Sequence, residues 1–192
     1  MSVLIYLHGF LSSPLSAKAL QTEAWLKANR PDIRYHCPQL SSYPGEARAA
    51  LEHLVQTLDD ESVGLIGSSL GGFWATYLVE RYNFSAVLVN PAVRPQDRFD
   101  EFVGLPLKNY YSDATYCLTP EDLHQLVRAD SEPLNNRDNY WVMLQTGDET
   151  LDYQLAVDKY QGCKLLVEEG GSHTFEGYQN WIPDIVEFLF KK

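Results

Sequence analysis

Short runs of apolar residues alternate along the chain with longer segments in which apolar residues recur at helical spacing. The short runs are rich in aliphatic residues and too short for core helices, so they predict strands. Strands separated by helices predict an α/β fold: a mainly parallel sheet with helices on both faces. The predicted strands cover residues 3–7, 33–37, 62–66, 86–89, 140–146 and 164–167.

The segments between these runs predict helices. Residues 16–29 form the first, with Ser16 as its N-cap and an apolar face made of Ala17, Leu20, Ala24 and Ala28. Pro44 opens a second helix, and a third follows residue 69. A short helix is expected near residues 153–160. The last, at about 180–190, is expected to bury Ile182, Ile185, Val186 and Leu189.

Residues 91–139 interrupt the alternation of predicted strands and helices. They are rich in Pro, Tyr and acidic residues and contain one predicted helix, at 120–128. We expect a small helical insertion over an edge of the sheet. A length of 192 residues is typical of one domain, so residues 1–192 are predicted to form a single α/β domain.

Charge and composition exclude several classes of protein. Fifteen Lys and Arg against 26 Asp and Glu give a formal charge of −11, which repels phosphate backbones, so nucleic acid is not an expected partner. No apolar run approaches the roughly 20 residues of a membrane span. The chain starts directly with a strand pattern instead of a secretion signal, so we expect a cytoplasmic protein. Cys37, Cys117 and Cys163 are too far apart for a disulfide framework or a zinc site, and we expect reduced thiols.

The strongest chemical signal is Gly67-Ser68-Ser69-Leu70-Gly71, which matches the G-x-S-x-G nucleophile elbow. Only Ser69 has glycines two residues before and two residues after it. A serine on a sharp strand-to-helix turn needs flanks without side chains, and this copy lies between a predicted strand and a predicted helix. Phosphate binding is disfavoured because Phe73, not Lys, follows Gly72.

A serine nucleophile needs a base, and His173 is the best candidate. In this type of fold the order along the chain is nucleophile, acid, histidine. His8, His36 and His53 precede the nucleophile, and His124 lies in the insertion. His173 follows the last predicted strand in a glycine-rich loop, which is the expected position.

The acid should follow the strand at residues 140–146, where three carboxylates occur. Asp148 comes immediately after the strand and is best placed to reach His173. Asp152 and Glu149 remain alternatives.

The oxyanion of a tetrahedral intermediate needs backbone donors that are already in place. One is expected to be the amide of Leu70, immediately after the nucleophile, and the second the amide of Phe10 in the loop after the first strand. Gly9 allows that loop to approach Ser69, and His8 is interpreted as structural. These loops converge at the carboxyl ends of the strands, where ligands of such sheets bind.

The chain resembles the α/β-hydrolase superfamily and, within it, the YqiA-like esterases. The resemblance spans nearly the whole chain and is carried by Tyr6-Leu7-His8-Gly9-Phe10, Ser12-Ser13-Pro14, Ser16-Ala17-Lys18-Ala19, Gly67-Ser68-Ser69-Leu70-Gly71-Gly72, Asn90-Pro91-Ala92, Gly147-Asp148-Glu149 and Leu151-Asp152-Tyr153. It implies a cytoplasmic serine esterase with a reduced α/β-hydrolase fold, in which Ser69, Asp148 and His173 are catalytic and Phe10 and Leu70 supply the oxyanion hole. In many relatives the acid lies three residues after the glycine, where this chain has Thr150, so the choice between Asp148 and Asp152 stays open.

The residues together predict a serine hydrolase that cleaves a small carboxylic ester or thioester without a metal or cofactor. The alternatives are a binding protein that keeps the fold without catalysis and an acyltransferase with the same triad. Arg94 and Lys108 are either contacts for an anionic substrate group or solvated charges. The insertion's aromatic residues either wall an acyl pocket or form a small core; they are Phe99, Phe102, Tyr110, Tyr111 and Tyr116.

Overall fold

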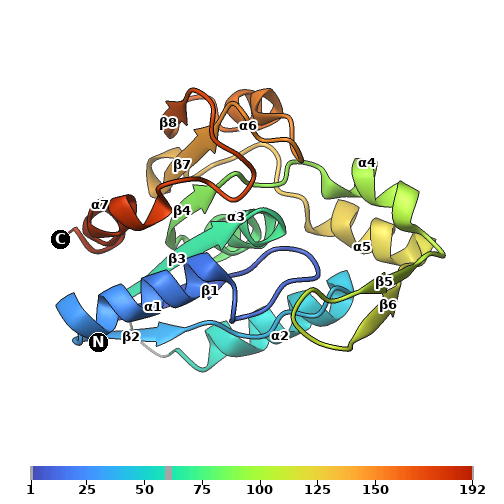
Figure 1. Ribbon diagram of the computed structural model, residues 1–192, viewed down its shortest axis with the longest axis horizontal. Helices are drawn as coiled ribbons and strands as arrows, with labels where there is room; N and C mark the ends of the chain where they lie inside the picture. The colour runs from blue at the N-terminus through green and yellow to red at the C-terminus, as the bar shows by residue number, and fades with distance from the viewer. Residues whose placement is uncertain (1, 59–61, 192) are drawn as a thin grey trace.

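Six parallel strands form the centre of the computed structural model, which describes residues 2–58 and 62–191 (Figure 1). The strands pair in the order β2-β1-β3-β4-β7-β8. The expected parallel sheet is therefore confirmed, and every strand predicted from the sequence is present. Their bounds are β1 (Ser2–Leu7), β2 (Ile33–His36), β3 (Ser62–Ser68), β4 (Ser85–Val89), β7 (Tyr140–Gln145) and β8 (Lys164–Glu168).

The strand order reverses between β1 and β3. The chain starts in β1, adds β2 on one side and then continues with β3 on the other side. In the register of this pair, Leu7 lies opposite Gly67, so both strands end at the same level. Loops that follow two such strands diverge and leave a crevice, which is where open α/β sheets bind ligands.

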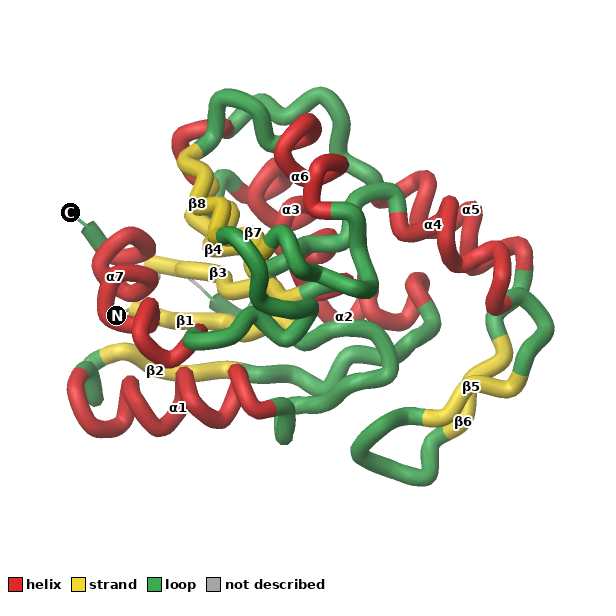
Figure 2. Tube along the Cα trace, turned by 45° about the horizontal axis from the view of Figure 1, so that its top comes forward, coloured by secondary structure: helices red, strands yellow, loops and turns green. Residues whose placement is uncertain are grey.

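Helices cover both faces of the sheet (Figures 1 and 2). On one face lie α1 (Ala17–Asn29) and α7 (Tyr178–Phe190), and on the other lie α2 (Pro44–Gln56), α3 (Leu70–Tyr82) and α6 (Tyr153–Lys159). Alternate residues of each strand point to opposite faces. In β1, Val3, Ile5 and Leu7 accordingly pack with α2 and α3, and Leu4 and Tyr6 with α1 and α7.

The predicted buried face of α7 is confirmed, but that of α1 is wrong. In α1 the residues expected to be buried are exposed, and Leu20 has a fractional exposure of 44%. The buried residues are Ala19, Thr22 and Leu26. Thr22 Oγ1 lies 2.8 Å from the Tyr178 hydroxyl of α7, so a buried polar pair sets the rotation of this weakly amphipathic helix. No helix in the described part of the chain is both long and apolar enough to cross a bilayer.

The insertion contains more secondary structure than the sequence predicts. It includes the predicted helix, α5 (Pro120–Ala129), together with α4 (Pro95–Phe99), the 3₁₀ turns η1 (Asp100–Phe102) and η2 (Arg137–Asn139), and a hairpin of β5 (Pro106–Lys108) and β6 (Thr115–Cys117).

The edge that the insertion covers is the one formed by the carboxyl ends of the strands. The Tyr110 amide donates to the Leu11 carbonyl at 2.8 Å, and Asn109 Nδ2 donates to the Ser12 carbonyl at 2.9 Å. Both contacts join the insertion to the loop after β1. The insertion therefore helps to enclose the crevice, and the view that residues 1–192 form one domain stays a prediction.

Candidate active site

Ser69 lies on a strained turn between β3 and α3. Its φ of 56° and ψ of −123° are unusual for a residue with a side chain. Three hydrogen bonds hold this backbone: the Ser69 amide donates to the Val89 carbonyl at 3.1 Å, and the Ser69 carbonyl accepts from the amides of Gly72 at 2.9 Å and Ala92 at 3.0 Å. The tertiary structure thus maintains a conformation that presents the Ser69 hydroxyl at the top of the sheet.

The glycines on either side of this turn allow its close packing. A Cβ atom on Gly67 would lie 2.4 Å from the Gly71 carbonyl oxygen, and one on Gly71 would lie 1.9 Å from the Leu7 carbonyl oxygen. Both contacts are far below van der Waals distance and involve backbone, which cannot rotate away. The G-x-S-x-G spacing therefore has a steric cause in this fold.

The structure brings Ser69, His173 and Asp148 together. His173 Nε2 lies 3.1 Å from Ser69 Oγ, although the two residues are 104 positions apart. His173 Nδ1 lies 2.8 Å from Asp148 Oδ2 and 3.0 Å from Oδ1. With Nδ1 protonated towards Asp148, Nε2 is free to accept the proton of the serine hydroxyl.

Asp148 is held in its ionised form. Burial raises the pKa of this carboxyl group, but hydrogen bonds from His173 and from the amides of Leu151 and Thr150 outweigh burial, and the net pKa is below its usual value. Both amides donate to Oδ1 at 2.8 Å. Thr150, three residues after Gly147, thus supports Asp148 through its backbone.

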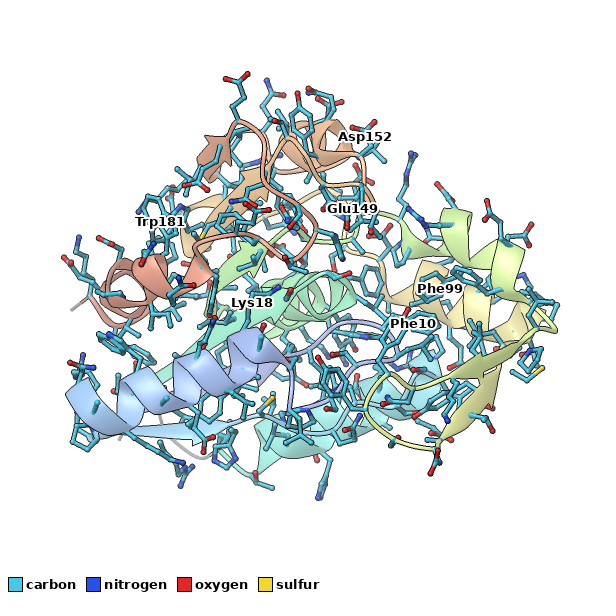
Figure 3. All side chains as sticks on the ribbon, in the orientation of Figure 1. Phe10, Lys18, Phe99, Glu149, Asp152 and Trp181 are labelled. Carbon is cyan, nitrogen blue, oxygen red and sulfur yellow. The ribbon has the colours of Figure 1, made fainter. Side chains whose placement is uncertain are left out.

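The two alternative acids occupy other positions. The Asp152 carboxylate caps α6, accepting from the Gln154 amide at 2.9 Å. Glu149 accepts a hydrogen bond of 2.9 Å from the backbone amide of His173, which lowers the pKa of Glu149. Figure 3 labels both side chains beside the chain segments that follow β7. The carboxylate that is hydrogen-bonded to the imidazole ring is that of Asp148.

Sequence reasoning missed two buried polar side chains that position the loop of His173. Asn90 Nδ2 donates to the carbonyls of Ser172 at 3.0 Å and His173 at 3.2 Å. Gln145 Oε1 accepts from the amides of Ser172 at 3.1 Å and Glu176 at 2.8 Å. A pattern in the sequence could have indicated both residues: each is a large polar residue at the carboxyl end of an otherwise apolar strand.

The amides of Phe10 and Leu70 have no hydrogen-bond acceptor within the part of the chain that the structure describes. Leu70 is the first residue of α3, so its amide lies at the positive end of the helix dipole. Gly9 brings the loop after β1 close to the nucleophile turn, since a Cβ there would lie 3.3 Å from Ser69 Cβ. Both amides are thus available to an oxyanion near Ser69.

The position of His8 agrees with the prediction from the sequence that this residue is structural. It is buried, its Nε2 accepts from the Leu40 amide at 3.0 Å, and its Nδ1 donates to the Gly9 carbonyl at 2.9 Å. Burial lowers its pKa, which favours the neutral ring that these bonds require. The His8 ring thus joins the loop after β1 to the segment after β2.

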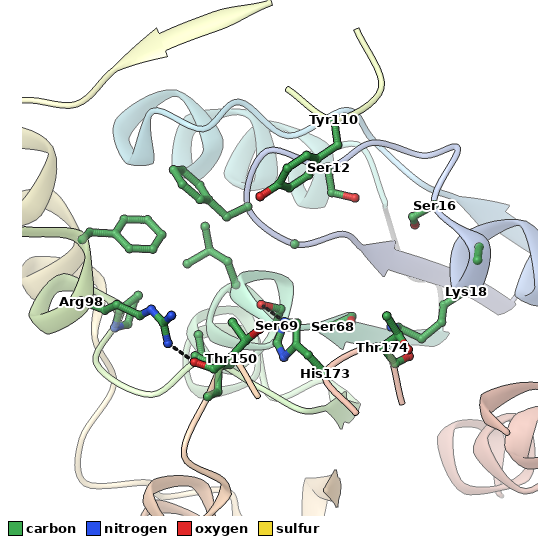
Figure 4. Close-up of a pocket in the computed structure, with 18 of the residues that line it drawn as sticks. Ser12, Ser16, Lys18, Ser68, Ser69, Arg98, Tyr110, Thr150, His173 and Thr174 are labelled. Carbon is green, nitrogen blue, oxygen red and sulfur yellow. Dashed lines mark hydrogen bonds between the residues drawn. The ribbon is translucent and has the colours of Figure 1, made fainter. Parts of the chain in front are cut away.

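A pocket of about 530 Å³ opens above Ser69, within the usual range for small-molecule sites. One end is aromatic. Between ring centres, Phe10 lies 4.4 Å from Phe99 and 6.2 Å from Phe102. Figure 3 shows Phe10 and Phe99 side by side. The other end is polar and is lined by Ser16 and Lys18, which Figure 4 shows together on one side of Ser69.

The aromatic residues of the insertion divide between the two expected roles. Phe99, Phe102, Tyr110 and Tyr111 line the pocket, whereas Tyr116 packs against Tyr43 outside it. The insertion therefore supplies a wall of the pocket, and Tyr116 makes a ring contact outside it.

The two basic residues weighed as substrate contacts do not line the pocket. Arg94 pairs with Asp97 at 3.2 Å, and Lys108 pairs with Asp113 at 2.9 Å. Both are neighbouring surface pairs that depend on local spacing. Lys18 and Arg98 are the cations that line the pocket instead, and Arg98 donates to the Thr150 carbonyl (Figure 4).

Comparison with known sequences assigns the chain to a family. The sequence model of the family described as "Uncharacterised protein family (UPF0227)" matches residues 3–190. The chain belongs to the UPF0227 family. A UPF0227 protein of Serratia proteamaculans is 29% identical over 97% of this chain and 98% of its own length. The UPF0227 protein YcfP of Escherichia coli is 27% identical with the same coverage.

Solved structures confirm the α/β-hydrolase fold of this UPF0227 member. Alpha/beta hydrolase domain-containing protein 10 from mouse aligns with a TM-score of 0.77 at 14% identity, covering 98% of this chain and 90% of its own. Est1E from Butyrivibrio proteoclasticus aligns with a TM-score of 0.71 at 14% identity, covering 99% and 87%. The expected resemblance to the YqiA-like proteins is confirmed, with the UPF0227 match showing the family and these structures showing the fold.

Among residues 2–58 and 62–191 of this UPF0227 chain, no group of three or more His, Cys, Asp or Glu side chains is arranged to hold a metal ion. That the reaction proceeds without a metal or cofactor stays a prediction.

Proposed function

We propose that this UPF0227 protein is a serine hydrolase that cleaves a small carboxylic ester or thioester through an acyl-enzyme. The observation that carries the proposal is the continuous hydrogen-bonded chain from Ser69 Oγ to His173 Nε2 at 3.1 Å and from His173 Nδ1 to Asp148 at 2.8 Å. The fold that the chain shares with carboxylesterase CesB from Bacillus subtilis supports it as an analogy.

In the first half-reaction, Ser69 Oγ attacks the acyl carbonyl while His173 Nε2 takes the hydroxyl proton. The carbonyl oxygen becomes an oxyanion, which accepts hydrogen bonds from the Phe10 and Leu70 amides. Asp148 keeps the imidazole in the required tautomer and stabilises its positive charge. When the tetrahedral intermediate collapses, His173 returns the proton to the leaving oxygen or sulfur, and the acyl group stays on Ser69.

In the second half-reaction, water takes the place of the departed alcohol or thiol. His173 removes a proton from this water, which attacks the acyl carbonyl and releases the carboxylic acid. The low pKa of Asp148 keeps its charge available in both halves. A cytoplasmic location remains part of the proposal.

The test is labelling with a fluorophosphonate probe, together with turnover of p-nitrophenyl esters. Wild-type protein should be labelled once and should turn over the ester. Ser69→Ala should lose both signals, whereas Ser68→Ala, which changes the adjacent hydroxyl, should keep the label. Labelling of Ser69→Ala at the wild-type rate would contradict the proposal.

The same experiment separates the alternative functions. A wild-type protein that takes no label and cleaves no ester would be a binding protein with an idle site. Wild-type protein that is labelled but transfers the acyl group to added glycerol in preference to water would be an acyltransferase, as product analysis would show.

A further inference from the structure

The pocket has a polar end for which the proposed hydrolysis has no use. Ser16 and Lys18 line it. Figure 4 shows Ser16 and Lys18 on one side of Ser69 and His173, with Arg98 of α4 on the other, and Figure 3 shows Lys18 apart from Phe10 and Phe99. The pocket thus continues in two directions from the nucleophile.

Lys18 lacks an anionic partner. Its Nζ donates to the Thr174 carbonyl at 2.8 Å, while an ammonium group has three donors. In the described residues no carboxylate lies within 4.0 Å of Nζ. Burial lowers the pKa of Lys18 to about 8, and only the more distant charge of Asp148 opposes this effect. Lys18 is half-buried, and a cation with reduced hydration and no anionic partner is destabilised, an effect that an anionic ligand would offset.

The N-terminus of α1 adds donors at the same place. Lys18 is the second residue of this 13-residue helix, whose first turn has no acidic residue and whose N-cap Ser16 makes no side-chain cap hydrogen bond. The first amides of a helix therefore stay unsatisfied beside the ammonium group, an arrangement that favours anions.

The Ser16 hydroxyl is an independent observation that points to a ligand. Its oxygen is buried and has no hydrogen-bond partner in the described structure, although buried hydroxyls are nearly always paired. Ser16 lines the pocket. Rotation of the Ser16 side chain would let this hydroxyl pair with a ligand oxygen that the ammonium group and the helix amides also contact.

The position of His173 identifies which part of the substrate would occupy this end. In the mechanism proposed above, His173 gives its proton to the leaving group, so the leaving group lies on the side of the imidazole. Thr174, whose carbonyl holds Lys18, is the next residue after His173. The aromatic end, between Phe10 and Phe102, is then left for the acyl group.

We propose that Lys18, Ser16 and the N-terminus of α1 bind an anionic oxygen group, a carboxylate or a phosphate, on the alcohol part of an ester whose apolar acyl group occupies the aromatic end. This inference rests on the proposed esterase function and names its substrate class. The overall charge of −11 disfavours the approach of anionic substrates at long range. The local cluster of Lys18, Ser16 and the helix N-terminus opposes this effect at short range.

The test measures kcat/KM for three esters that differ in the position of charge. They are p-nitrophenyl butyrate, its analogue with a carboxylate on the nitrophenyl ring, and p-nitrophenyl hemisuccinate, which has the carboxylate on the acyl part. Butyryl glycerol phosphate compared with monobutyryl glycerol tests phosphate in the same way. The kcat/KM of each charged ester is divided by the kcat/KM of its neutral counterpart. This ratio is compared between each variant and wild type, so differences in the chemical reactivity of the esters cancel.

Lys18→Met should lower the ratio for esters charged on the leaving group by about tenfold or more, mainly through KM, since a charged hydrogen bond is lost. Lys18→Arg keeps the positive charge and should retain most of the ratio. Lys27→Met is the matched control: Lys27 is on the same helix and its pair with Glu23 is exposed, so loss of its charge should change no ratio.

An unchanged ratio in Lys18→Met, with wild type active on the neutral esters, would overturn this inference and leave the esterase proposal intact. An equal fall for the hemisuccinate would also overturn it, because the anion would then not be placed on the leaving-group side. If Lys18→Met does not fold, an equally low ratio in Lys18→Arg and in Lys18→Gln would count against a role of charge. Absence of turnover of every ester by wild type would overturn the esterase function and this inference together.

Discussion

The side-chain amide of Asn90 donates hydrogen bonds to the backbone carbonyls of His173, at 3.2 Å, and Ser172, at 3.0 Å. Asn90 follows β4 and His173 follows β8, and these strands are separated in the sheet by β7. The side-chain oxygen of Asn90 accepts a hydrogen bond of 3.0 Å from the backbone amide of Gln145 in β7. One side chain therefore ties together the ends of three strands and fixes the backbone that carries the imidazole.

Replacing this amide should reduce catalysis by misplacing His173. In Asn90→Ala we expect kcat to fall by about tenfold or more, because a small displacement of a catalytic group is costly. The free energy of unfolding should fall by about 1–3 kcal/mol, since buried groups lose their partner. Asn139→Ala, which removes an exposed hydrogen bond of 2.8 Å to Asn83, is the control. The rate of fluorophosphonate labelling should follow kcat; an unchanged rate in folded Asn90→Ala would disprove the positioning role.

Replacing the candidate acid should separate Asp148 from Asp152. Asp148→Asn loses the acceptor that fixes the tautomer of His173, and kcat should fall by about 10³–10⁴. In Asp152→Asn the new side chain can still cap α6, so activity should stay at the wild-type level. Steady-state kinetics on one ester decides between them. The reverse pattern would make Asp152 the acid.

The pKa of Asp148 predicts how stability depends on pH. Because this pKa is lower in the folded chain than in the unfolded chain, ionised Asp148 stabilises the fold. The contribution is fully present above the unfolded value of about 4 and is lost as the pH falls through the folded value. Urea unfolding of wild type and Asp148→Asn should therefore give a difference that shrinks on acidification below about pH 4. A constant difference would contradict this assignment.

Two helical glycines should respond differently to alanine. Gly71→Ala places Cβ 1.9 Å from the rigid Leu7 carbonyl, whereas Gly45→Ala places it 2.0 Å from Gln125 Oε1, the end of a flexible side chain. Helix propensity alone favours both changes by about 1 kcal/mol. We expect Gly71→Ala to lose about 3 kcal/mol or more, and Gly45→Ala to change by less than about 1 kcal/mol. Thermal and urea unfolding check both values, and a stable Gly71→Ala would refute the steric explanation.

The aromatic end should control acyl length. Phe102 is partly buried and lines the pocket, so Phe102→Ala makes room for a longer chain. We expect the ratio of kcat/KM for octanoate over butyrate esters to rise by about tenfold or more, the effect of at least one methylene in an apolar pocket. Tyr116→Ala, outside the pocket, is the control. A fall in this ratio, or no change in it, would place the acyl group elsewhere.

The strands, the principal helices and the turn at Ser69 were all predictable from the sequence. Strand and helix periods are local properties, and the glycines around Ser69 are required by contacts of the strand and helix that flank it. The choice of His173 followed from the order of nucleophile, acid and histidine along the chain in this type of fold, and its place in the structure agrees with it.

The tertiary structure alone decided the features that depend on residues far apart in the chain. The buried face of α1 is set by the Thr22–Tyr178 hydrogen bond, between residues 156 positions apart. The contact of Asp148 with His173, and the approach of Lys18 to the same loop, likewise join segments that no local pattern links. Side-chain periodicity records which face of an element is apolar, whereas these partners are chosen by the way the elements pack.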